Sequence, residues 1–356
     1  MGISLLEYSA TSAKTRAMFS KLLTNDDYLY LLSRKTVRDV VEYLKKNTAY
    51  NKVLLNINEN NVHRNELEMV FKESIYDDFN KILRFLSDDS LKFIKASFLR
   101  HELEDIKVLL REIYTGRDNE FIIDSLVFLK KHSKIDYKKL FNSKSLNDLI
   151  GNLKGTEYYK ALSYFSRREE GQNLFDMEMS LDINYFMLII KLKEKLLSGK
   201  DNKLISMSLG MEIDIMNIMF IYRSKKLFNL SKEITLNNVI PFWFRLKKEQ
   251  LVGLAECNDI QEFKEYVERT PYSKIFRANE EHLWEINSIN YLYKFYKSLL
   301  RKGQFTLGAI MGYMHLKDID VRNIITIIEG VRYSLPEDEI KSYIVGKSDK
   351  LDKFGK

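Results

Sequence analysis

The chain has 356 residues, of which 45% are hydrophobic, and a formal net charge of +7. No unbroken apolar run approaches the ~20 residues that cross a bilayer, and the first residues lack a basic region followed by an apolar stretch, so we expect neither a membrane span nor a secretory signal. The single cysteine, Cys257, excludes an intrachain disulfide, and mild basicity without a basic–aromatic cluster argues against nucleic-acid binding.

Three predicted helices begin with the same capping pattern. A residue whose side chain can accept from free backbone N–H groups is followed three positions later by a carboxylate, which favours the positive end of a helix. Apolar residues at helical spacing come next in each case. The three starts are Thr36-Val-Arg-Asp39, Ser145-Leu-Asn-Asp148 and Asp259-Ile-Gln-Glu262.

A repeated phrase follows each start after eleven or twelve residues and is predicted to close the helix. The threonines of successive copies are 108 and 114 residues apart. Each repeat is therefore far longer than one pair of helices. The three copies read Thr48-Ala-Tyr50-Asn-Lys52-Val-Leu54, Thr156-Glu-Tyr158-Tyr-Lys160-Ala-Leu162 and Thr270-Pro-Tyr272-Ser-Lys274-Ile-Phe276.

A third marker keeps the same order and nearly the same spacing. Each marker lies in a predicted helix, because apolar residues around it share one face. The three copies are Glu102-Leu-Glu-Asp105-Ile106, Asp214-Ile-Met-Asn217-Ile218 and Asp320-Val-Arg-Asn323-Ile324. Between the markers, residues 66–86 and 178–197 lack Gly and Pro and are predicted to be long helices. With only three prolines and no alternating strand pattern, the sequence predicts an all-α protein.

The repeats predict three similar helical modules, at residues 1–117 (with the N-terminal helix), 118–230 and 231–356. Asp214 and Asn217 are neighbours on one helix surface, as are Asp320 and Asn323. We interpret such a pair as structural, satisfying a nearby loop or helix end, with a direct partner contact as the alternative. The copies are not identical: Asp105 replaces the asparagine.

Candidate docking residues follow Pro241, which predicts a chain turn or a helix start. Phe242, Trp243, Phe244 and Arg245 form either helical core or a protruding anchor for a partner. Arg223 is a further candidate for a structural or interface role, although Glu329 stands at the corresponding offset of the third copy.

The sequence carries no complete motif for catalysis, cofactor binding or metal binding. Gly346-Lys347-Ser348 resembles the end of a phosphate-binding loop, but Lys341 occupies the position of the required earlier glycine. None of the five histidines lies at metal-ligand spacing from another histidine or from Cys257. We therefore expect no catalytic, cofactor-binding or metal-ligating residues. These features fit a helical-repeat scaffold or adaptor that binds an acidic protein partner.

The chain resembles the C subunit of the bacterial and archaeal V-type (A-type) rotary ATPases, equivalent to the eukaryotic d subunit, over nearly its whole length. The resemblance rests on residues 8–23, 181–186, 212–223 and 270–272 and on Asp320-Val-Arg-Asn323-Ile324. It implies a funnel-shaped, all-helical body with three modules around a pseudo-three-fold axis.

The resemblance also implies a function. The protein would be a non-catalytic rotor component without cofactors, linking the D and F subunits of the central shaft to the membrane ring of proteolipid (c/K) subunits. It would transmit torque for ATP-coupled H⁺ or Na⁺ transport, as a peripheral component on the cytoplasmic face of the membrane.

Overall fold

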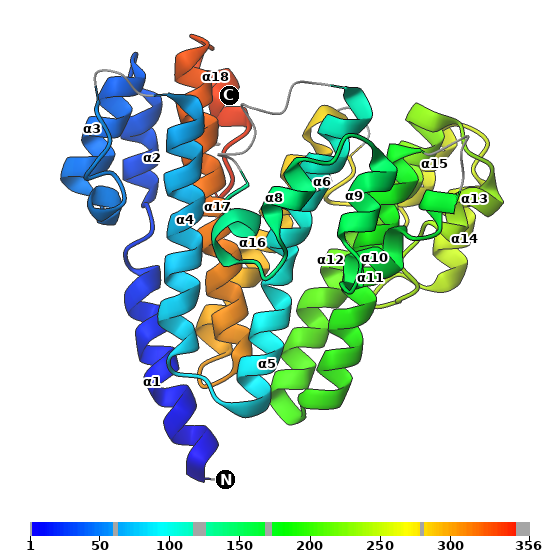
Figure 1. The fold of residues 1–356 in the computed structure, drawn as a ribbon, viewed down its shortest axis with the longest axis horizontal. Helices are drawn as coiled ribbons and strands as arrows, with labels where there is room; N and C mark the ends of the chain where they lie inside the picture. The colour runs from blue at the N-terminus through cyan, green and yellow to red at the C-terminus, as the bar shows by residue number, and fades with distance from the viewer. Residues whose placement is uncertain (1, 60–62, 117–125, 168–172, 278–280, 347–356) are drawn as a thin grey trace. The chain divides into compact units, whose positions relative to one another are not determined.

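A computed structural model describes residues 2–59, 63–116, 126–167, 173–277 and 281–346. Over these ranges the protein consists of helices and connecting turns without a strand, which confirms the predicted all-α class (Figure 1). The chain forms two compact units. Unit 1 joins Met1–Ser87 to His282–Lys356, and unit 2 is Asp88–Glu281.

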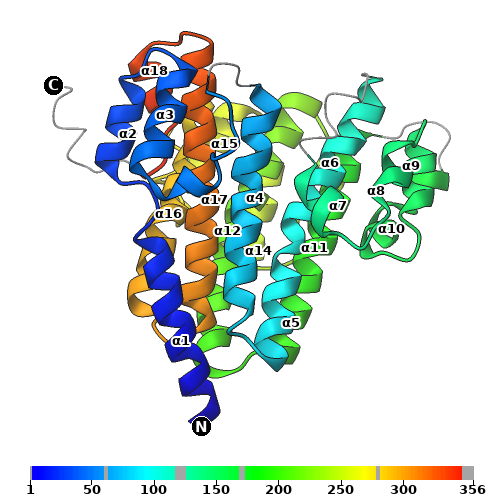
Figure 2. The same ribbon diagram turned by 60° about the vertical axis from the view of Figure 1, so that its left-hand side comes forward.

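Unit 1 is built around one long helix from the end of the chain. This helix, α17 (Leu307–Arg332), lies beside α16 (Trp284–Lys302) and contacts α1, α2, α3, α4 and α18 (Figures 1 and 2). The remaining bounds are α1 Gly2–Phe19, α2 Asn25–Leu32, α3 Val37–Asn47, η1 Ala49–Lys52, α4 Arg64–Leu83 and α18 Glu337–Ser342. The first and last parts of the chain therefore share one core.

Close packing of α16 against α17 depends on a glycine. A Cβ atom at Gly312 would lie 2.9 Å from the backbone oxygen of Tyr296, closer than real Cβ contacts allow. A glycine at this point lets the two helices approach each other, and the neighbouring residues of α17 are buried along most of its length.

Unit 2 contains two further long helices, α11 (Leu174–Leu196) and α12 (Gly199–Phe228), which contact each other. Helices α5, α6 and α10 pack on α11, and α13, α14 and α15 pack on α12. The short helix η5 (Glu281–Leu283) lies where the chain passes from unit 2 to unit 1. The bounds of the other helices of unit 2 are α5 Asp88–Ser97, α6 Leu99–Thr115, α7 Val127–His132, α8 Tyr137–Phe141, α9 Leu146–Asn152, α10 Glu157–Leu162, η4 Phe165–Arg167, α13 Lys232–Asn237, α14 Lys248–Glu256 and α15 Ile260–Val267.

Helix α12 is long and apolar enough to cross a membrane by length and composition, although no unbroken apolar run marks it in the sequence. However, 72% of its most apolar window is buried inside the protein. Its apolar side chains thus have protein neighbours on most sides, as in the core helix of a helical protein.

The three predicted helix starts are confirmed. Thr36, Ser145 and Asp259 are N-caps whose side chains accept from the backbone N–H three residues on. The repeated phrase closes the first helix as predicted, because Thr48 is the C-cap of α3, whereas α9 and α15 have their C-caps at Leu153 and Glu268, shortly before Thr156 and Thr270. Thr48 and Thr156 also begin the next short helix as N-caps, because their hydroxyl oxygens accept from its first free N–H groups.

The predicted long helices are also confirmed, with shifted ends. Residues 66–86 correspond to α4, and residues 178–197 to α11, whose start lies upstream because Asn173 caps it. The three markers lie in α6, α12 and α17. The predicted boundary between the first and second modules, after residue 117, lies outside the described residues. The predicted boundary between the second and third modules, after residue 230, lies in the turn between α12 and α13.

Candidate functional site

Asp214 binds a loop of backbone through its carboxylate. It is fully buried in α12 and accepts from the backbone N–H groups of Phe244 at 3.3 Å, Arg245 at 2.8 Å and Leu246 at 3.0 Å. The hydroxyl of Tyr272 donates to the same carboxylate at 2.8 Å. Burial raises the pKa of Asp214, while these hydrogen bonds act in the opposite direction. One side chain thus holds both the loop before α14 and the third copy of the repeated phrase.

Asn217 lies one turn further along α12 and binds the same loop. Its amide nitrogen donates to the carbonyl of Ile240 at 3.0 Å, and its amide oxygen accepts from the Ile240 N–H at 2.9 Å. Both partners are buried. Because a buried backbone group without a partner is costly, this amide satisfies a residue that lies outside any helix.

Asp320 and Asn323 repeat this arrangement in unit 1. Asp320 accepts from the N–H of Leu23 at 3.2 Å and from the hydroxyls of Tyr28 and Tyr50, the latter at 2.6 Å. Asn323 donates to the carbonyl of Val345 at 2.9 Å and accepts from its N–H at 3.0 Å. The pair on α17 therefore holds segments from both ends of the chain.

In the first copy, Asp105 replaces asparagine yet keeps part of the contact. It accepts from the N–H groups of Phe128 and Leu129, both at 2.9 Å. A carboxylate cannot donate to a carbonyl, so it binds two N–H groups where asparagine binds one N–H and one C=O. Burial and then the Glu102 carboxylate raise the pKa of Tyr158, but its hydroxyl has no hydrogen-bond partner among the described residues.

These contacts follow one rule, and we call them the acid–tyrosine pairs. The tyrosine of each repeated phrase lies beside the acidic residue of the marker in the preceding copy. The first phrase has no preceding copy and pairs with the last marker. The pairs are Tyr158 with Glu102, Tyr272 with Asp214, and Tyr50 with Asp320. The order of pairing is thus cyclic, although the chain is linear.

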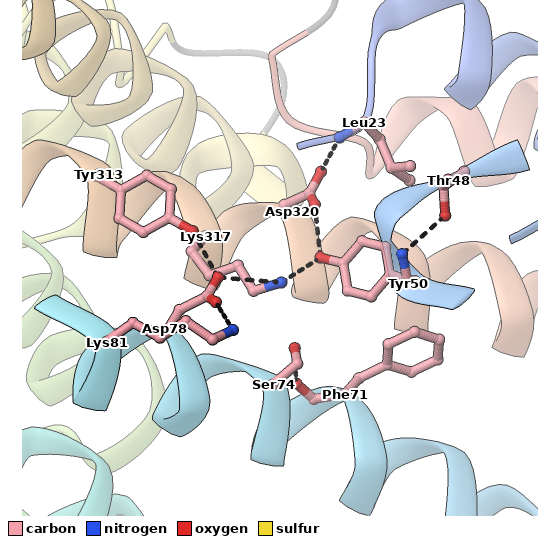
Figure 3. A network of polar contacts seen from close by, with 10 residues as sticks. All are labelled: Leu23, Thr48, Tyr50, Phe71, Ser74, Asp78, Lys81, Tyr313, Lys317 and Asp320. Carbon is pink, nitrogen blue, oxygen red and sulfur yellow. Dashed lines mark hydrogen bonds and ion pairs between the residues drawn. The ribbon is translucent and has the colours of Figure 1, made fainter. Parts of the chain in front are cut away.

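A polar network in unit 1 is centred on Lys317 (Figure 3). Lys317, three residues before Asp320, is only 5% exposed. Its ammonium group donates to the hydroxyl of Tyr50 at 2.9 Å, lies 4.1 Å from the centroid of that ring, and is 3.9 Å from the Asp78 carboxylate. Burial lowers the pKa of Lys317, while Asp320 and Asp78 act in the opposite direction.

Asp78 in α4 links the network to its surroundings. Its carboxylate accepts from the hydroxyl of Tyr313 at 2.5 Å and pairs with the ammonium of Lys81 at 2.9 Å (Figure 3). The sequence offered one signal for this network, a lysine inside the long apolar run of α17, where the second copy has Met211 and the first has Leu99. We did not predict the network from this lysine.

The candidate docking residues lie in a loop, not at a helix start. Trp243 is 42% exposed, whereas Phe242 and Phe244 are half-buried. The ring of Phe244 covers Gly210, where a Cβ atom would lie 2.4 Å from it. Only Trp243 of the three aromatic residues is exposed, and Arg245, two residues further along the chain, is exposed too.

The remaining candidates lie apart from these contacts. Arg223 is half-buried on α12, nine residues beyond Asp214. Burial raises the pKa of Cys257, which is buried. No three His, Cys, Asp or Glu side chains within the described ranges converge as metal ligands. The N–H of Gly346 donates to Asn290 at 2.9 Å, and residues 347 and 348 lie outside the described residues.

Glu281 contributes to the stability of unit 2 in a pH-dependent way. Hydrogen bonds from Lys226, Lys264 and Tyr222 lower its pKa to about 2. Because the folded pKa lies below the ordinary value of 4.5, the carboxylate stabilises the fold fully above that pH and progressively less as the pH falls towards 2. Urea unfolding at about pH 7 and about pH 3.5 should show the stability gap between wild type and Glu281→Gln narrowing at the lower pH. A gap that stays constant or widens would contradict this assignment.

Comparison with known proteins gives a match over nearly the whole chain. The sequence model of the family described as ATP synthase (C/AC39) subunit matches residues 11–343. The chain is 25% identical over 361 residues to the C subunit of the A-type ATP synthase of Methanocaldococcus jannaschii, covering 97% of this chain and 88% of that protein. It is 25% identical to the same protein of Methanosphaera stadtmanae (95% and 88% covered) and of Methanococcoides burtonii (95% and 94% covered).

Proposed function

Since the chain belongs to the ATP synthase (C/AC39) subunit family of A/V-type ATP synthases, we propose that it is the rotor component between the central shaft and the membrane ring. In this role it performs no catalysis. It binds the D and F subunits of the shaft on one side and the proteolipid (c/K) ring on the other, at the cytoplasmic face of the membrane, and transmits torque for H⁺ or Na⁺ transport.

The observation that carries this proposal is the family match over residues 11–343, and the cyclic acid–tyrosine pairs support it. A body that transmits torque must resist shear, which close-packed helices do. Buried polar contacts such as Asp214 and Asp320 add fixed points between helices and loops, because breaking them leaves unsatisfied groups. The three modules then surround a pseudo-three-fold axis as a funnel that receives the shaft.

The cyclic pairing also separates this proposal from the scaffold alternative. An open solenoid would leave its first and last repeats apart. Here α17 contacts α1, α2, α3 and α4, so the ends of the chain meet. Closure of this kind favours a collar over an extended groove.

Binding to the shaft tests the proposal directly. The purified full-length chain, mixed with purified D and F subunits at micromolar concentrations, should elute with them as one complex from a sizing column. Repeating the run at several salt concentrations separates specific association from charge-driven association. If exposed Trp243 is an anchor, Trp243→Ala should co-elute less completely on the same column. Failure of the wild-type chain to co-elute at every salt concentration would overturn the proposal.

A further inference from the structure

Unit 1 contains a cavity of about 660 Å³ next to the Lys317 network. It is lined by residues of α1, η1, α4 and α17 and by the segment after α1. Its volume lies within the range of about 300–1,000 Å³ that is usual for small-molecule sites. Five lysines line it, namely Lys14, Lys21, Lys52, Lys81 and Lys317.

The charges around this cavity do not balance. Two carboxylates, Asp77 and Asp78, face the five lysines. Asp78 is already engaged by Lys81, Lys317 and Tyr313. By contrast, the side chains of Lys14, Lys21 and Lys52 make no ion pair or hydrogen bond with any described residue. The side chains of three lysines from separate segments thus line one space without an ion-pair partner among the described residues.

The base of the cavity is fixed in place. Lys317 is buried and held by Tyr50 and Asp78, and Tyr50 is in turn held by Asp320 (Figure 3). An ammonium group with so little water around it gains more from a nearby anion than an exposed one does. A rigid charged base below three unpaired lysines is a suitable geometry for a compact anion with several charges.

We propose that this cavity binds a small, multiply charged anion that bears phosphate groups. Phosphate concentrates several negative charges in a small volume, and lysines supply separate point charges that can surround it. A helix of a partner protein is about 10–12 Å across with its side chains, so a cavity of this size could hold only its end. The inference does not depend on the proposed rotor function.

The site is specific to one copy. At the position of Lys317, the second and first copies have Met211 and Leu99, so they lack the charged base. The lysine of the repeated phrase does recur, and Lys160 is the second copy's equivalent of Lys52. Lys160 is exposed and paired with Glu157 at 2.7 Å, so it provides a matched control.

Calorimetric titration of the full chain with inorganic tripolyphosphate tests the proposal. We expect one bound anion per chain and binding that weakens as salt rises. The variant combining Lys14→Gln, Lys21→Gln and Lys52→Gln should bind roughly tenfold more weakly or worse, while Lys160→Gln should bind like wild type. These exposed or half-buried lysines lie outside the buried network, and far-UV circular dichroism with a melting curve checks that the variants stay folded.

Further arms identify the source of the phosphate. Binding of tripolyphosphate and ATP, without lysine-dependent binding to phosphatidylcholine vesicles containing phosphatidic acid, supports a soluble ligand. Lysine-dependent vesicle binding supports a lipid headgroup carrying the same phosphate chemistry. The proposal would be overturned if none of these probes binds at millimolar concentration, or if the triple variant binds them as well as wild type does. It would also be overturned by an adventitious 1:1 signal that Lys160→Gln loses too, or by a chain that binds polyglutamate but none of the phosphate probes.

Discussion

Replacing Asp320 by alanine is expected to lower the free energy of unfolding by about 3–5 kcal/mol. The substitution removes the shared acceptor of the Leu23 N–H and of the Tyr28 and Tyr50 hydroxyls. It also leaves the buried ammonium of Lys317 without the carboxylate that most favours its charged form. The loss should be cooperative, because these groups share one network.

Urea unfolding followed by far-UV circular dichroism measures this loss. Asp338→Ala is a suitable control, because Asp338 is exposed in α18 and should change stability by less than about 0.5 kcal/mol. A loss below about 1 kcal/mol for Asp320→Ala would show that the network does not hold the chain ends together.

Replacing Asn217 by alanine should cost about 2–4 kcal/mol, because both backbone groups of buried Ile240 lose their partner. Asn217→Asp, which imitates Asp105 of the first copy, keeps an acceptor for the Ile240 N–H but no donor for the carbonyl. Because this carboxylate would also be buried near Asp214, its cost should be at least as large as that of alanine.

Melting temperature and co-elution with the shaft subunits separate the two interpretations of this residue. If Asn217 is structural, Asn217→Ala lowers the melting temperature, while the folded fraction still binds the shaft pair. Loss of shaft binding with unchanged melting would contradict a structural role and indicate a direct partner contact.

Local signals in the sequence predicted local structure well. Thr36, Ser145 and Asp259 cap helices as expected, because N-capping depends on a residue and the backbone three positions on. The threonine of the phrase that follows has a second role that was not predicted, because the same residue can close one helix and cap the next. Only the backbone geometry showed that Thr48 and Thr156 begin the next short helix.

Long-range pairing was beyond sequence reasoning from a single chain. The repeats supplied a tyrosine and an acidic residue in each copy, but spacing does not tell which tyrosine meets which acid. The lysine-lined cavity could not be predicted for the same reason, because its lining residues are spread along the chain from Lys14 to Lys317. Residues so far apart in the chain leave no periodic pattern.

The joining of the two chain ends in unit 1 has a consequence for biosynthesis. Leu23 and Asp320 are separated by 297 residues, so α1 and α4 leave the ribosome long before α17 exists to cover them. At about 5–20 residues per second, that interval is roughly 15–60 s. Unit 2 is complete within this time and is expected to fold first, while the apolar face of α4, with Phe71 and Phe79, waits for α17 to be synthesised.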